Sequence, residues 1–245
     1  MQLQDILYSQ GFGTRRVCAG LIQQGFVAVC PRGGTHFSFV LDAAANIPEA
    51  GLRFQVQGVL WRYCAKAYLV LNKPAGTECS QKPSTYPSIY TLLPAPLRQR
   101  PSKSAVAGVQ AVGRLDQDTT GMLLLSDDGQ FLHRMTSPKK HVPKVYQVTT
   151  KHAIDADQIR LLIHGVVLDD DPAPVRAAAC VQTGERSIDL TLTEGKYHQV
   201  KRMVAAAGNR VEALHRSQIG HMRLPSDLQP GQWRWLEDEE LTLLR

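Results

Sequence analysis

The sequence lacks the usual features of membrane, secreted and metal-binding proteins. Its 245 residues include no run of about 18 apolar residues, the length that a membrane-spanning helix needs. The N-terminus, MQLQDILYSQ, does not have the basic-then-apolar profile of a signal peptide. The five cysteines are odd in number, lie far apart and form no CxxC pair, which argues against a disulfide framework or a zinc site. We therefore expect a protein with no membrane contact and no metal, in a reducing cytoplasm.

Acidic residues are scarce in three stretches of the chain. Residues 61–115 contain eight Lys or Arg and one acid, residues 134–144 contain four bases and no acid, and residues 196–223 contain six bases, three histidines and one acid. The sign reverses at EDEE, residues 237–240. Segregated positive charge is typical of proteins with a polyanion partner, because each neutralised phosphate releases counterions. On charge alone, a solvated basic face without a partner remains the alternative.

The first thirty residues predict two short helices and a strand. LQDILYSQG is expected to form a helix that ends at Gly11, and Thr14 is a suitable N-cap for a second helix that ends at Gly25, before the strand FVAVC. Arg15 and Arg16 lie in the first turn of the second helix, where the helix dipole disfavours cations. A phosphate ligand at the helix start would explain their position, and so would simple solvation.

The remaining pattern predicts a second, larger domain with an α+β fold. Residues 43–62 have few periodic apolar positions, which indicates a small domain over 1–60 and a larger one over 61–245, with a linker-like stretch at 93–108. Buried strands are expected at 68–72 and 121–126, alternating half-buried strands at VYQVTT and SIDLTLTEG, and helices at 130–136, 155–164 and 197–207. This mixture is typical of a mixed or antiparallel sheet.

A polar turn, GRLDQDTTG at 113–121, directly precedes the apolar MLLLS. As a calcium loop it would offer Asp116, Asp118 and Thr120 as ligands, but its ninth position is a leucine and no amphipathic helix precedes it. As an aspartyl nucleophile motif of the haloacid-dehalogenase type it should follow an apolar strand, whereas here the strand comes after it. The third interpretation uses Asp116 as a single reacting carboxylate without a metal, with Arg114 contacting nucleic acid.

Four separated motifs resemble, in their order, those of the RsuA/RluB/RluE/RluF class of RNA pseudouridine synthases. They are YLVLNKPAG (68–76), GRLDQDTTG (113–121), KVYQV (144–148) and EGKYHQVKRMVAAAGNRVEALHRSQIG (194–220). The N-terminal segment is similar to an S4-type RNA-binding module at Gly11, Thr14, Arg15, Leu21, Ile22, Gly25, Val27 and Val29. DDGQFLHRMTSP and EGKYHQVKRM are most similar to the RsuA branch, the 16S rRNA pseudouridine(516) synthases. The resemblance implies a small S4-like RNA-binding domain followed by a pseudouridine synthase catalytic domain.

The resemblance also implies roles for single side chains. Asp116 corresponds to the catalytic carboxylate, either as nucleophile at C1′ or as base on the sugar. Tyr146 corresponds to the tyrosine that packs against uracil, and Lys201 to the cation beside the carboxylate. Arg202 is the alternative cation, because consecutive helix positions cannot both face inward. Arg114 corresponds to the arginine that fills the gap left by a flipped base. Further RNA contacts are expected from the basic residues Arg15, Arg16, Lys144, Lys196 and Arg202.

The expected partner is ribosomal RNA, as the small-subunit rRNA or an assembly intermediate. Pseudouridine formation breaks the N1–C1′ bond and joins C5 to C1′ without redox change, so neither cofactor nor metal is expected, and the protein is expected to be a monomer. One alternative is a large-subunit 23S rRNA synthase of the RluB/RluE/RluF type. Another is a non-catalytic RNA-binding or ribosome-assembly factor, which the intact Asp116, Tyr146 and Lys201 disfavour.

Overall fold

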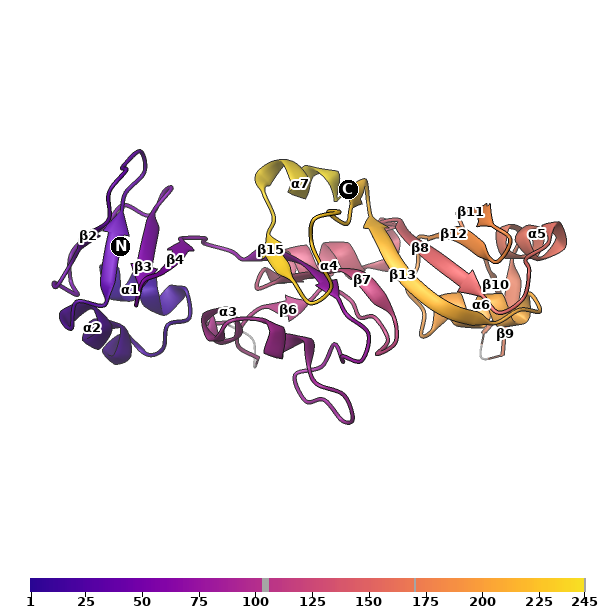
Figure 1. Ribbon diagram of the computed structural model, residues 1–245, viewed down its shortest axis with the longest axis horizontal. Helices are drawn as coiled ribbons and strands as arrows, with labels where there is room; N and C mark the ends of the chain where they lie inside the picture. Colours follow the sequence, from indigo (N-terminus) through magenta and orange to yellow (C-terminus); the bar gives the residue numbers. More distant parts are fainter. Residues whose placement is uncertain (103–105, 170, 245) are drawn as a thin grey trace. The chain divides into compact units, whose positions relative to one another are not determined.

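The chain forms two compact units in a computed structural model that describes residues 1–102, 106–169 and 171–244 (Figure 1). Unit 1 comprises Met1–Ala67 and Leu93–Gln110, and unit 2 comprises Tyr68–Leu92 and Ala111–Arg245. Residues 103–105, which belong to the linker-like stretch expected from the sequence, lie outside the described residues. Each unit has a hydrophobic core of its own.

In residues 1–67 of unit 1, two helices pack against a four-stranded antiparallel sheet. These elements are α1 (Leu3–Ser9), α2 (Arg15–Gln23), β1 (Val27–Cys30), β2 (Ser38–Phe39), β3 (Arg53–Val56) and β4 (Val59–Arg62), with the strand order β2-β1-β3-β4. Leu3, Ile6 and Leu7 share one face of α1 and are buried in the core with Phe54 of β3. The Thr14 hydroxyl accepts the Val17 N–H at 3.3 Å and caps α2. The two helices and the strand predicted for this segment are therefore confirmed.

Residues 93–110 cluster with unit 1, whereas the sequence pattern had placed them in the domain 61–245. Their helix α3 (Ala95–Gln99) passes so close to Gly11, at φ +91°, that a Cβ there would collide with an α3 backbone carbonyl. The buried Arg100 guanidinium donates to Gln10 Oε1 at 2.8 Å and to the Cys64 carbonyl at 2.7 Å. These contacts join segments far apart in sequence, so no local pattern near residue 60 could reveal them.

Unit 2 contains a mixed sheet with the main strand order β11-β12-β8-β13-β7-β5-β15 (Figure 1). These strands are β5 (Tyr68–Lys73), β7 (Thr120–Ser126), β8 (Lys144–Thr150), β11 (Ala179–Gly184), β12 (Ser187–Leu192), β13 (Val211–Ile219) and β15 (Trp233–Trp235). Adjacent strands on this path are antiparallel except β13 and β7, which pair in parallel. The α+β class with a mixed sheet, predicted from alternating and continuous apolar runs, is confirmed.

Helices cover this sheet through two apolar clusters. The remaining elements are η1 (Ile89–Leu92), β6 (Gln110–Ala111), α4 (Gly129–Thr136), η2 (Pro138–Lys140), α5 (Ala156–His164), β9 (Val166–Leu168), β10 (Asp171–Val175), α6 (Gln199–Ala206), β14 (Met222–Arg223) and α7 (Asp238–Leu243). Phe131 and Met135 of α4 pack in one cluster with Met122 of β7. Met203 and Val204 of α6 belong to the other, with the inward residues of β8, β12 and β13. The helix predicted at 197–207 begins later than expected, because the backbone turns at position 198 before α6 starts.

The polar turn 113–121 leads into a buried strand. β7 starts at Thr120 and buries every residue from Gly121 to Ser126. An extended strand of this length, roughly 3.3 Å per residue, separates Asp127 from Asp116 and Asp118, so residues 116–127 do not coil around one calcium ion. The strand also follows the motif, which is the reverse of the order that the phosphatase interpretation needs.

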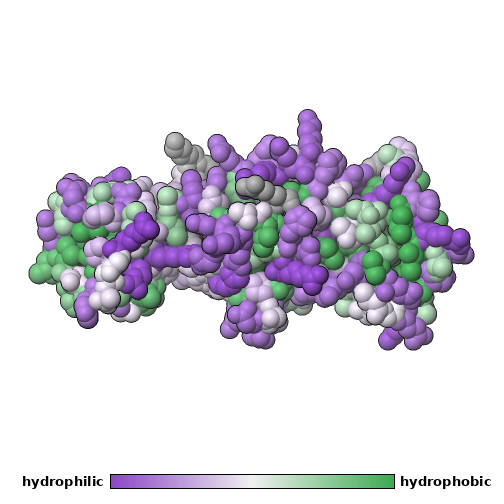
Figure 2. Space-filling view, turned by 90° about the horizontal axis from the view of Figure 1, so that it is seen from above, coloured by the Kyte–Doolittle hydropathy of each residue, from purple (hydrophilic) through white to green (hydrophobic). Residues whose placement is uncertain are grey.

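Hydrophilic residues cover most of the face of the molecule shown in Figure 2, and hydrophobic ones form separate patches. Exposed apolar side chains such as Phe39, Val59 and Val181 are scattered over both units. Scattered exposure of this kind is ordinary for globular proteins and assigns no function. Among the described residues, no helix combines the length and the apolar character needed to cross a membrane.

Candidate active site

Asp116 lies in the turn before β7, and its carboxylate faces the start of α6. Oδ2 of Asp116 is 3.0 Å from Lys201 Nζ, and Oδ1 is 3.2 Å from His198 Nε2. Two glycines with positive φ, Gly113 at +73° and Gly121 at +101°, bracket the turn. At Gly121 a Cβ would collide with the Arg216 backbone of β13, so only glycine lets the chain enter β7 at this angle.

Lys201 is shared between two carboxylates. Its ammonium lies 2.7 and 2.9 Å from the two oxygens of Asp118 as well as 3.0 Å from Asp116. Burial by itself would lower the pKa of Lys201, but the hydrogen bonds and charges of Asp118 and Asp116 outweigh it and raise the pKa above the ordinary lysine value. For Asp118, burial by itself would raise the pKa, but Lys201 outweighs it and the pKa is lowered. Both carboxylates therefore face a firmly protonated amine.

Arg202, the neighbouring base, binds the backbone just before α6. Its guanidinium donates to the Tyr197 carbonyl at 3.2 Å and holds the turn before α6. His198 sits in this turn with φ +48°, in the left-handed region, where a non-glycine residue costs roughly 1 kcal/mol or more. Strained backbone is common at functional sites, and here it brings the imidazole to Asp116. No local pattern in the sequence indicates this contact, because His198 and Asp116 lie in motifs far apart in the chain.

A fully buried lysine supports the Asp116 turn from below. Lys73, the last residue of β5, donates to the carbonyls of Pro74 at 3.1 Å, Gln117 at 3.3 Å and Thr119 at 2.9 Å. Burial lowers its pKa, and the charges nearby, including those of Asp118 and Asp116, offset only part of that effect. In the sequence, Lys73 lies in the motif YLVLNKPAG, where Asn72 and Lys73 follow an apolar run and are expected to stabilise the edge of the active-site sheet.

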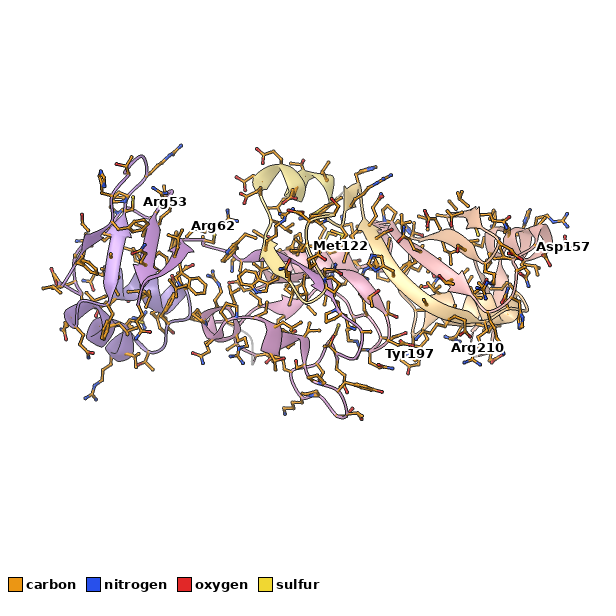
Figure 3. The ribbon with its side chains drawn as sticks, viewed as in Figure 1. Arg53, Arg62, Met122, Asp157, Tyr197 and Arg210 are labelled. Atoms are coloured by element: carbon orange, nitrogen blue, oxygen red, sulfur yellow. The ribbon has the colours of Figure 1, made fainter. Side chains whose placement is uncertain are left out.

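The opposite wall carries Lys144 and Tyr146, which lie two positions apart on one face of β8. Arg216 of β13 is buried behind them: its Nε donates to the carbonyl of Met122, labelled in Figure 3, at 2.8 Å, and its Cζ lies 6.0 Å from the Tyr146 ring centre. Burial, with the Arg216 charge adding to it, lowers the pKa of Lys144, whose Nζ donates to the Val142 carbonyl at 2.9 Å. Arg216 was not singled out from the sequence, because an arginine in a strand usually points to solvent.

These elements enclose one pocket of about 500 Å³. It brings together the residues predicted separately from three motifs, and its lining includes Arg114, Asp116, Lys144, Tyr146, Lys196, His198 and Lys201. Two buried polar atoms of the lining residues, Thr119 Oγ1 and Arg216 Nη2, have no hydrogen-bond partner within the described part of the chain. Buried polar groups without partners cost about 1–3 kcal/mol each, so these two atoms lower the stability of the pocket wall.

Two predicted RNA contacts lie in unit 1. Arg16 is exposed at the start of α2. Arg15 is exposed too, but its Nε pairs with Asp5 at 2.6 Å and its guanidinium lies 4.2 Å from the Tyr8 ring centre. This local carboxylate explains how a cation is tolerated at a helix start without any ligand. An exposed ion pair of this type is weak, so it does not prevent Arg15 from contacting phosphate.

Comparison with known proteins shows the family to which the chain belongs. The profile of the family described as RNA pseudouridylate synthase matches residues 67–206. The chain is 40% identical over 194 residues, 79% of each protein, to a ribosomal small subunit pseudouridine synthase A of Yersinia pestis. It is also 36% identical, over 100% of this chain and 98% of the relative, to an uncharacterized RNA pseudouridine synthase, YtzG, of Bacillus subtilis. A crystal structure of a pseudouridylate synthase superposes on the whole chain with 33% identity and a TM-score of 0.67. The chain therefore belongs to the RNA pseudouridylate synthase family, and its class within the family is that of RsuA.

Proposed function

We propose that this pseudouridine synthase isomerises one uridine of small-subunit ribosomal RNA, at the RsuA-type position 516 of 16S rRNA. The observation that carries the proposal is the Asp116 carboxylate, held between Lys201 at 3.0 Å and His198 at 3.2 Å beside a pocket of about 500 Å³. A pocket of this size accommodates one flipped nucleotide. The names of the relatives, ribosomal small subunit pseudouridine synthase A, support the choice of rRNA subunit.

Three side chains carry the chemistry in this proposal. Asp116 reacts with the ribose while the N1–C1′ bond breaks, and C1′ then bonds to C5 of the rotated base. Tyr146 packs against the uracil ring from β8. Lys201 orients the Asp116 carboxylate, because its ammonium lies 3.0 Å from Oδ2. The C5 proton leaves and N1 gains a proton, so the reaction is an isomerisation that needs no external oxidant or reductant.

The basic residues around the pocket bind the RNA backbone in this proposal. Arg114 is exposed at the pocket and is placed to occupy the space that the flipped base vacates. Lys144 and Lys196 line the same pocket. Arg202 supports the turn that leads into α6 by donating to the Tyr197 carbonyl. Unit 1 acts as the S4-like RNA-binding module, with Arg15 and Arg16 on its second helix. Its two helices followed by the strand β1 support that assignment for the expected domain 1–60.

Loss and restoration of a single modified site tests the proposal. A strain that lacks the gene should lose one 16S rRNA pseudouridine, mapped by carbodiimide treatment and primer extension, and the wild-type gene should restore it. Asp116→Asn should not restore it, because the amide keeps the shape of the carboxylate but loses its charge and nucleophilicity. The purified variant should still bind the rRNA. Turnover by this variant above a few per cent of wild type would remove Asp116 from the mechanism.

The same map decides between the two rRNA subunits. Loss of a 23S rRNA pseudouridine, with the 16S site intact, would place the enzyme with the large-subunit synthases. The substrate would then change, but the roles of Asp116, Tyr146 and Lys201 would not.

A further inference from the structure

Tyr197 lies at the rim of the active-site pocket with most of its side chain in solvent. Its two neighbours in the chain, Lys196 and His198, both line the pocket. Tyr197 itself is 70% exposed, and Figure 3 shows it at the outer edge of unit 2. A tyrosine ring presents a large, rigid surface on which a nucleic-acid base can stack.

The exposed ring is held in a fixed orientation. It stacks on the His198 imidazole with ring centres 3.8 Å apart and an angle of 21° between the planes. The same imidazole lies 3.2 Å from the Asp116 carboxylate. Arg202 donates to the Tyr197 carbonyl at 3.2 Å and fixes the backbone from the side of α6. Because the ring is already ordered, a ligand that stacks on it loses little free energy to immobilising the side chain.

We propose that Tyr197, backed by His198, is a stacking platform for the RNA base next to the target uridine. One face of the ring is covered by His198, and the 70% exposure of the residue leaves the other face open to a base. When the target uridine leaves its stack, an adjacent base loses a stacking partner, and an aromatic ring at the pocket rim replaces that partner. Lys196, the residue before Tyr197 in the chain, lines the pocket and brings a positive charge to this rim, where a backbone phosphate of that nucleotide would lie. The inference rests on the proposed isomerisation of a uridine in rRNA.

Substitution of Tyr197 should change substrate binding more than chemistry. We expect Tyr197→Ala to raise KM about tenfold, the loss typical of one base–aromatic stack, with kcat changed less than threefold. Tyr197→Phe keeps the ring and should retain the wild-type KM. Tyr86→Ala is the matched control, since Tyr86 is a 40% exposed tyrosine of the same unit outside the pocket lining. A KM unchanged by Tyr197→Ala, or raised equally by Tyr86→Ala, would overturn the proposal.

A double-mutant cycle, in which Tyr197→Ala is combined with RNA substrates that lack one base, identifies the base that stacks on Tyr197. The substrate is a structured fragment around the uridine whose modification disappears in the deletion strain, so an error in the assigned rRNA subunit does not affect this test. Removing the base on one side of the target should raise KM about tenfold for the wild type and little further for Tyr197→Ala. If Tyr197→Ala and removal of a base raise KM independently, so that their effects multiply for the bases on both sides of the target, Tyr197 stacks on neither neighbour.

Discussion

Replacement of Lys73 by methionine should lower the activity much more than it changes the stability of the fold. Methionine has a similar length and fills the site without an ammonium, so Lys73→Met removes three hydrogen bonds to the carbonyls of Pro74, Gln117 and Thr119. Charge-assisted bonds of this kind are worth about 1.5–3 kcal/mol each. Burying an ammonium without a directly bonded carboxylate costs several kcal/mol, which offsets much of that gain. We therefore expect the free energy of unfolding to change by no more than about 2 kcal/mol, or roughly 8 °C in Tm.

Activity should fall much further than stability. The Gln117 and Thr119 carbonyls belong to the turn that carries Asp116, and the Pro74 carbonyl follows β5. Two of the three also accept other hydrogen bonds: the Gln117 carbonyl from the Gly76 N–H at 2.8 Å, and the Pro74 carbonyl from the Thr77 hydroxyl at 3.0 Å. The turn should stay folded but shift, and a displacement of 1 Å at a reacting group can cost about 10²-fold in rate. We expect single-turnover pseudouridine formation to slow by about that factor, measured by tritium release from C5-labelled RNA.

A pH series adds a second test of the same lysine. The pKa of Lys73 in the folded chain is below the ordinary lysine value of 10.5, because burial disfavours the ammonium. Between these two pKa values the unfolded chain binds more protons, so the unfolding free energy should rise with pH there. The free-energy cost of burying the charged Lys73 ammonium is fully present at pH values below its folded-state pKa and disappears above pH 10.5. Lys73→Met should lack this rise, whereas Lys151→Met, at an exposed lysine, should keep it. A Lys73→Met enzyme with wild-type turnover would refute the support role.

Three further predictions follow from single contacts. Asp118→Asn should reduce kcat/KM about threefold to tenfold without abolishing activity, since Lys201 keeps Asp116 as a partner at 3.0 Å but loses its second carboxylate; a complete loss would make Asp118 a reacting group. Gly121→Ala should lower stability by about 2–4 kcal/mol in urea unfolding, because its Cβ would collide with the β13 backbone, whereas Gly129→Ala, with open space around its Cβ, should change it by less than about 0.5 kcal/mol. Glu78 accepts three backbone N–H groups, which lower its pKa to about 2, so Glu78→Gln should speed amide exchange in that loop above pH 5; unchanged exchange would contradict this anchoring.

The sequence by itself determined several of the elements and the candidates for the reacting groups. Continuous apolar runs placed β5 and β7, alternation placed β8 and β12, and the cap at Thr14 placed α2, because these signals depend on neighbours within one or two turns of chain. The order of four motifs pointed to Asp116, Tyr146 and Lys201 before any contact between them was known. The structure then placed all three at one pocket.

Only the tertiary structure decided how the site is held together. The contact between Lys201 and Asp118 spans 83 positions, and that between Lys73 and Thr119 spans 46, so both depend on which strands pair rather than on local pattern. The same holds for Arg216 behind Tyr146 and for residues 93–110, which join the N-terminal unit instead of the catalytic one. A lysine at the end of a strand and an arginine within one have no periodicity that distinguishes a buried support from a solvated charge. The burial of Lys73 and Arg216 is set by the parallel pairing of β13 with β7 and the antiparallel pairing of β5 with β7. These pairings place both side chains beside the Asp116 turn.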